Sequence, residues 1–208
     1  MKLRMASLIL LCLALASTPA WADYNNGPIN GNIDAWTINF GFIVSDTFEA
    51  DSSQVDGFMF GAREFPGDTT VTVDWSITSG ENGGQVLGSG TANVLDQFIS
   101  VNAFGYDIDL ISVTGLHVPT VLSTQYWLNL QNAVTKDGEI VFWDENSGIG
   151  CTSPGCPSIA SENTLGSIPS EAFTINTSGG GATPEPNSFL LLGSGILGLA
   201  GLLRRKLL

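Results

Sequence analysis

The chain has 208 residues, with 20 acidic against seven basic side chains and a formal net charge of −13. Five of the basic residues lie at the two ends, so residues 23–182 carry 19 acidic and two basic residues, a formal charge of −17 (2 − 19). A domain this acidic repels phosphate backbones, which excludes nucleic acid as a partner class. It also leaves carboxylates available for divalent cations.

Residues 1–22 have the pattern of a secretory signal peptide. Two basic residues precede an apolar run from Ala6 to Ala16, and Ala20-Trp21-Ala22 supplies the small-x-small motif. We expect signal peptidase to cleave after Ala22. An N-terminal membrane helix is the alternative, but the apolar run is short for a bilayer. The pattern therefore predicts export through the inner membrane.

Residues 23–176 show strand patterns and turn signals in succession. The strand patterns cover 35–48, 54–65, 67–78, 85–94, 103–113, 124–134, 139–146 and 171–176. The clearest is 67–78, where Val71, Val73, Trp75 and Ile77 alternate with polar residues to form one apolar face. Because Gly/Asn/Asp turns separate these segments and no amphipathic helix interrupts them, we predict an all-β, antiparallel β-sandwich with a jelly-roll-like topology. Residues 177–183 are predicted to form a flexible Gly-rich linker.

The tryptophans fall within the predicted strands, at positions 36, 75, 127 and 143. Core packing is the role that we expect for them, with stacking against a ligand as the alternative. Two cysteines, Cys151 and Cys156, flank a Thr-Ser-Pro-Gly turn sequence. In an exported protein this pair predicts a local disulfide. Two alternatives fit this cysteine pair less well. A metal site would need further soft ligands nearby, and a thioredoxin-type redox motif has two residues between its cysteines, whereas this pair has four.

Oxygen donors are grouped directly after the strand that contains Trp143. Asp144, Glu145 and Asn146, followed by Ser147, form a possible calcium-binding loop. The spacing does not match an EF-hand, and a solvated turn is the alternative interpretation. No other cofactor is predicted.

Catalytic signals are sparse. The single histidine, His117, has no nucleophile motif beside it, and one histidine excludes zinc sites built on several. Paired carboxylates could serve a glycosidase. The candidates are Asp107 with Asp109, and Asp144 with Glu145, with Glu64 and Glu139 as further acids. In so acidic a domain such neighbours arise readily, so we expect no enzyme.

The C-terminal segment contains three parts in a fixed order. Pro184-Glu185-Pro186 comes first, a Gly/Leu-rich apolar span follows over about 188–203, and Arg204-Arg205-Lys206 ends it. The apolar span predicts a single transmembrane helix, slightly short for the roughly 30 Å hydrocarbon core. The basic cluster predicts a cytoplasmic C-terminus.

This arrangement resembles the PEP-CTERM sorting signal, with the resemblance confined to about residues 183–208. The resemblance implies recognition by exosortase, a membrane-embedded processing enzyme of bacteria that make extracellular polysaccharide. It also implies removal of the tail after transient anchoring, and transfer of the remainder to the cell surface or matrix.

Three functions remain open for the predicted sandwich. We expect a non-enzymatic surface or matrix protein that binds polysaccharide or mediates assembly. A secreted carbohydrate-active hydrolase with paired carboxylates is the first alternative. An ice-binding protein is the second, for which the Thr-rich stretch 69–73 is the one local hint.

Overall fold

The computed structural model describes residues 24–146 and 160–177. The predicted signal peptide with its Ala20 and Ala22, the linker, the PEP motif, the apolar span and the basic cluster lie outside these residues. So do Cys151 and Cys156, and their disulfide stays a prediction. Over the two described ranges, no helix is long and apolar enough to cross a membrane.

The described residues form two antiparallel sheets, and all of their regular elements are strands. The seven-stranded sheet, here sheet A, contains β1 (Tyr24–Asn25), β2 (Ala35–Thr37), β4 (Gln54–Glu64), β7 (Leu95–Val101), β8 (Asp107–Pro119), β10 (Phe142–Asp144) and β13 (Phe173–Thr177). The six-stranded sheet, here sheet B, contains β3 (Ile43–Glu49), β5 (Thr70–Gly80), β6 (Gly83–Asn93), β9 (Gln125–Thr135), β11 (Ala160–Glu162) and β12 (Gly166–Ile168). The predicted all-β, antiparallel class is confirmed.

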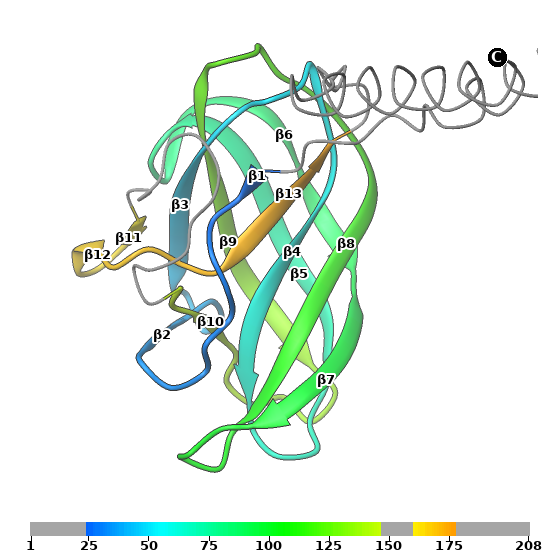
Figure 1. The fold of residues 1–208 in the computed structure, drawn as a ribbon, viewed down its shortest axis with the longest axis vertical. Helices are drawn as coiled ribbons and strands as arrows, with labels where there is room; N and C mark the ends of the chain where they lie inside the picture. Colours follow the sequence, from blue (N-terminus) through cyan, green and yellow to red (C-terminus); the bar gives the residue numbers. More distant parts are fainter. Residues whose placement is uncertain (1–23, 147–159, 178–208) are drawn as a thin grey trace, which may run out of the picture. The chain divides into compact units, whose positions relative to one another are not determined.

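Strand β4 organises sheet A. One of its edges pairs with β8, and β8 pairs in turn with β7; the other edge is shared between β13 and the short β10. Sheet B has the order β12-β11-β3-β9-β5-β6. The two sheets lie face to face as two layers (Figure 1). Because β6 and β7 are separated only by Val94, the chain passes from one sheet to the other at this edge.

The core lies between the sheets and draws apolar side chains from both. Phe58 and Phe60 of β4 and Trp143 of β10 come from sheet A, whereas Trp75 and Leu128 come from sheet B. Alternation along each strand places these residues on the inner face. Trp143 is fully buried and its indole Nε1 donates a hydrogen bond to the Ala172 carbonyl. Core packing is therefore the role of Trp75 and Trp143, while Trp36 packs at the margin of the core and Trp127 is half-buried.

Three predicted strands differ clearly in extent from the observed ones, and of the segment 139–146 only Phe142–Asp144 form a strand, β10. The segment 35–48 is divided into β2 and β3, in different sheets, because a turn with positive φ at Phe40 and Gly41 interrupts it. The segment 103–113 contains the start of β8, whose true range is 107–119, and β7 precedes it as a separate strand. Sequence alternation does not show where the chain crosses between sheets, which explains the division of 35–48, whereas β7 and β8 are paired within one sheet.

The start of β5 departs from the predicted alternation. Val73, Trp75 and Ile77 are buried as predicted, but Val71 is exposed and Thr70 is buried. The register with β9 shifts between Thr70 and Thr72, and such an irregularity reverses which side chains face inward. As a consequence the Thr70 hydroxyl, rather than a valine, faces the space between the sheets.

Candidate functional site

Three carboxylates from three strands of sheet A meet at one end of the sandwich. Glu64 ends β4, Asp109 is near the start of β8, and Asp96 is near the start of β7. The register places Asp109 opposite Ala62, so Glu64 and Asp109 are neighbours on the inner face. Asp96 lies opposite Ile111, a buried residue of the same face. We call Glu64, Asp96 and Asp109 the carboxylate cluster.

The cluster is compact and largely hidden from solvent. One oxygen from each carboxylate can be chosen so that all three lie within 4.8 Å of one another. Glu64 is 0% exposed and Asp109 4% exposed, while Asp96 is half-buried. Glu64 Oε2 and Asp109 Oδ2 are buried and have no hydrogen-bond partner among the described residues. Buried polar atoms are nearly always paired, so two orphaned oxygens in one cluster mark an unusual place in the fold.

Sheet B contributes Thr70 to this cluster. The Thr70 hydroxyl donates a hydrogen bond of 2.5 Å to Glu64 Oε1, and the Thr70 amide donates one of 2.7 Å to Asp96 Oδ2. The irregularity at the start of β5 is what turns this threonine inward. The cluster thus lies between the two sheets, with three acids on one side and a hydroxyl on the other.

The electrostatics of the cluster disfavour three bare negative charges. Burial raises the pKa of Glu64 to about 8, with a further contribution from the neighbouring acids Asp96 and Asp109. Burial likewise raises the pKa of Asp109 to about 7, helped by Asp96 and Asp107. The pKa of Asp96 is raised for the same reason. Near neutral pH the cluster therefore either keeps protons or takes up a positive charge.

No basic side chain of the described residues neutralises the cluster. Arg63, the neighbour of Glu64, points to the other side of β4 and forms an ion pair of 2.8 Å with Asp144. The described residues contain one further ion pair, the exposed contact between His117 and Asp56 at 3.8 Å. Lys136 is exposed and takes part in neither pair. The charge of the cluster is thus left without a protein counter-ion among residues 24–146 and 160–177.

The residues of the predicted calcium loop make hydrogen bonds and backbone contacts within the fold. Asp144 is fully buried: its Oδ1 accepts a hydrogen bond from Arg63 Nε, and its Oδ2 accepts hydrogen bonds from the Asn30 and Gly31 amides, both at 2.9 Å. Glu145 is in a β-bridge with Glu171, and Asn146 donates from Nδ2 to Ser170 Oγ and to the Asn26 carbonyl. These contacts hold the N-terminal segment against sheet A. Asp144 thus accepts hydrogen bonds from three donors, and the calcium site at Asp144, Glu145 and Asn146 stays a prediction.

The other predicted acids and the histidine are dispersed. Asp107 pairs in register with Glu64, but its Oδ2 accepts a hydrogen bond from the Gly67 amide at 2.8 Å. His117 lies toward the opposite end of β8 and its side chain is 78% exposed. The candidate acids that the structure brings together are thus Glu64 and Asp109. Sequence reasoning missed Asp96, because its strand, β7, was not among the predicted strands and no local pattern marks this acid.

A hollow of about 280 Å³ opens near the cluster. Its lining combines the 39–40 turn with the end of β9 and the turn after it: Asn39, Phe40, Asn132, Ala133, Val134, Thr135, Gly138 and Glu139. Phe40 is 68% exposed and Val134 52% exposed, so an apolar surface stands beside amide and carboxylate groups. Thr135 lies opposite Thr70 in the sheet, which places this hollow and the carboxylate cluster at the same end of the sandwich.

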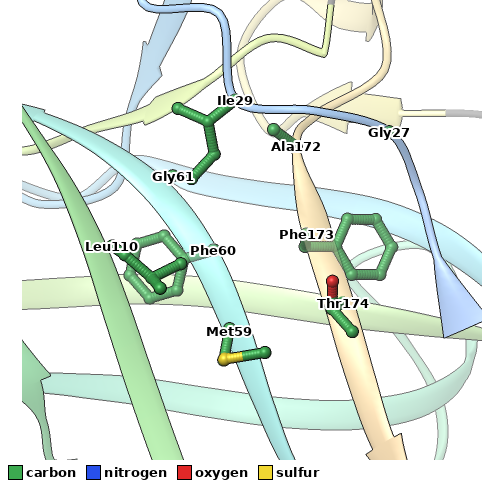
Figure 2. A pocket seen from close by; sticks show the side chains of 9 residues that line it. All are labelled: Gly27, Ile29, Met59, Phe60, Gly61, Leu110, Ala172, Phe173 and Thr174. Carbon is green, nitrogen blue, oxygen red and sulfur yellow. The ribbon is translucent and has the colours of Figure 1, made fainter. Parts of the chain in front are cut away.

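A second, smaller hollow lies on the outer side of β4 and offers little chemistry. Figure 2 shows Ile29 above Gly61, with Met59, Leu110 and Phe173 nearby. A Cβ at Gly61 would stand 2.7 Å from Ile29 Cγ1, so the glycine allows this close packing. Thr174 supplies the one polar side chain of the lining. This hollow is a packing feature of the N-terminal segment.

Comparison with known proteins identifies the C-terminal segment. Residues 182–206 match the family model described as the PEP-CTERM protein-sorting motif. No curated protein matches the chain. The motif implies exosortase-dependent sorting of an exported surface protein, and processing by an exosortase-type membrane enzyme.

Proposed function

Because residues 182–206 form a PEP-CTERM sorting motif, we propose that this protein is a non-enzymatic component of the cell surface or extracellular matrix, whose sandwich binds polysaccharide. The sorting motif is the observation that supports a location at the cell surface or in the matrix. The hollow beside Phe40 supports the binding role. The apolar span 188–203 anchors the chain transiently and is then removed with the basic tail.

The burial of the candidate acids supports a non-catalytic role. A glycosidase needs two carboxylates on either side of a cleft that admits a sugar ring. Glu64 and Asp109 are close to one another, but they are 0% and 4% exposed, so a sugar has no access to them. Asp144 is held by Arg63 in the interior. The hydrolase alternative therefore lacks an accessible pair among these acids.

The Thr-rich stretch gives little support to ice binding. Within 69–73, Thr70 faces inward and Thr72 is half-buried, which leaves Thr69 as the exposed threonine. A flat array of threonines is therefore not presented by this strand.

The hollow beside Phe40 has the composition of a sugar-binding surface. An exposed aromatic ring can cover the apolar face of a sugar, while Asn132 and Glu139 offer polar groups for its hydroxyls. The domain charge of −17 repels polyanions. We therefore assign a neutral or amine-bearing polysaccharide, rather than an acidic one, as the ligand class.

A glycan-binding assay with paired variants tests this role. The wild-type protein should be retained by insoluble neutral or amine-bearing polysaccharide without releasing oligosaccharide. Phe40→Ala should weaken retention roughly two- to tenfold, since a stacked ring contributes about 0.5–1.5 kcal/mol. Phe104→Ala is the matched control, because Phe104 is 67% exposed but outside the hollow. Equal retention of both variants, or release of oligosaccharide, would overturn the proposal.

Assembly through β7 is the second candidate function. Among the described strands β7 pairs with β8 alone, so its other edge is unpaired. Four of its apolar residues are between 48% and 68% exposed: Leu95, Phe98, Ile99 and Val101. An exposed apolar edge strand is a template for pairing with a second copy. Sedimentation should then show oligomers that Ile99→Lys abolishes, whereas Val134→Lys on β9 leaves them intact.

A further inference from the structure

The carboxylate cluster has the geometry of a cation site. Two ligands on opposite sides of a calcium ion, each at about 2.4 Å, are separated by about 4.8 Å. The chosen oxygens of Glu64, Asp96 and Asp109 all lie within 4.8 Å of one another, so one ion can contact all three. Such convergence of three acids at the interior of a sandwich is costly without a positive charge.

The orphaned oxygens are the independent observation. Within residues 24–146 and 160–177, Glu64 Oε2 and Asp109 Oδ2 are buried without a hydrogen-bond partner, on residues that are 0% and 4% exposed. Thr70 satisfies one oxygen of Glu64 and one of Asp96, and does not reach these two atoms. A metal ion bound among the three carboxylates would give both of these atoms a partner.

We propose that Glu64, Asp96 and Asp109 bind one calcium ion between the two sheets. The carboxylates supply three or more of the six to eight oxygens that calcium takes, and water completes the shell on the side of the half-buried Asp96. The ion joins the ends of β4, β7 and β8 and faces Thr70 of β5. It stabilises the end of the sandwich that also carries the hollow at Phe40, but its presence is testable independently of polysaccharide binding.

Calcium is favoured over magnesium by the size and chemistry of the cluster. Magnesium requires oxygens at about 2.0–2.1 Å in octahedral geometry and keeps several waters. A buried set of three carboxylates leaves less room for such waters. A monovalent ion would neutralise one of the three negative charges, whereas a divalent ion neutralises two of them.

The test is calcium binding to the full-length chain, purified in detergent and stripped with EDTA. Calorimetry should show one saturable site for CaCl₂, with MgCl₂ binding more weakly. Ligand linkage predicts that calcium at 100 times its dissociation constant raises the melting temperature by roughly 5–10 °C. Absence of a saturable calcium site at millimolar concentration, or tighter binding of magnesium, would overturn the assignment.

Isosteric variants separate the cluster from the general acidity of the domain. Glu64→Gln and Asp109→Asn should each weaken calcium binding at least tenfold and remove the thermal shift. Asp74→Asn is the control: it deletes the same charge from β5, where Asp74 accepts hydrogen bonds from Thr91 and Asn132 instead. Equal loss in the control and in either cluster variant would refute the site. Because the EDTA-stripped wild type is itself decisive, the test holds even where one variant fails to fold.

Discussion

Replacing Asp144 by alanine is expected to remove the hydrogen bonds by which this residue holds the 30–31 segment to sheet A, and so to destabilise the fold. The change removes the partner of Arg63, whose side chain is 9% exposed, across a 2.8 Å ion pair. It also removes the acceptor of the Asn30 and Gly31 amides, each at 2.9 Å. Among the described residues, Arg63 would keep its hydrogen bond to the Asp34 carbonyl alone.

The magnitude follows from the burial of the pair. Breaking a buried ion pair by removing one partner costs about 3–5 kcal/mol, because the other charge stays buried and uncompensated. That is a large part of a total stability of roughly 5–15 kcal/mol. At about 2–4 °C per kcal/mol for a domain of this size, the melting temperature should fall by roughly 6–20 °C.

Urea unfolding followed by tryptophan fluorescence measures this loss, with Trp143 next to the substituted position as a reporter. Asp144→Asn is the graded control, since it keeps the volume and one acceptor oxygen and should lose less. The double variant Arg63→Met, Asp144→Leu should recover much of the stability, because neither charge then remains buried. A loss below about 1 kcal/mol for Asp144→Ala would refute the view that this pair secures the segment.

Three further outcomes are expected. In the native host, intact mass should show a mature chain that ends near the PEP motif, whereas Glu185→Ala should retain the C-terminal tail. In EDTA, the free energy of unfolding should fall as the pH rises from about 4.5 to 8, because the pKa of Glu64, raised to about 8, keeps a proton on the folded state that the unfolded state has lost. The slope is up to about 1.4 kcal/mol per pH unit for each carboxyl whose pKa is raised in this way. Glu64→Gln should flatten this slope. Gly61→Ala should destabilise the protein by roughly 1–3 kcal/mol, since its Cβ would meet Ile29 Cγ1 at 2.7 Å, and Ile29→Ala should relieve most of that loss.

The features that depend on residues adjacent in the sequence could be predicted from the sequence. Alternation over 67–78 has a period of two, and it identified the inward positions of Val73, Trp75 and Ile77. Repeated turn signals without helical patterns indicated an all-β, antiparallel fold. The PEP-CTERM motif is contiguous, so its match to residues 182–206 needed no structure.

The carboxylate cluster could not be predicted in this way, because its members come from β4, β7 and β8 and its hydroxyl from β5. Whether an acid faces inward depends on strand register, and the irregularity at the start of β5 exchanged Val71 for Thr70 at the inner face. Asp144 shows the same dependence on tertiary structure: Arg63, 81 positions away in the sequence, pairs with it in the interior, and no local pattern indicated that pairing. The sequence by itself determined the fold class and the sorting motif, since both depend on patterns of residues that are close together in the sequence. Only the tertiary structure decided which acids are paired and which are left facing one another, because pairing across strands is set by register and burial.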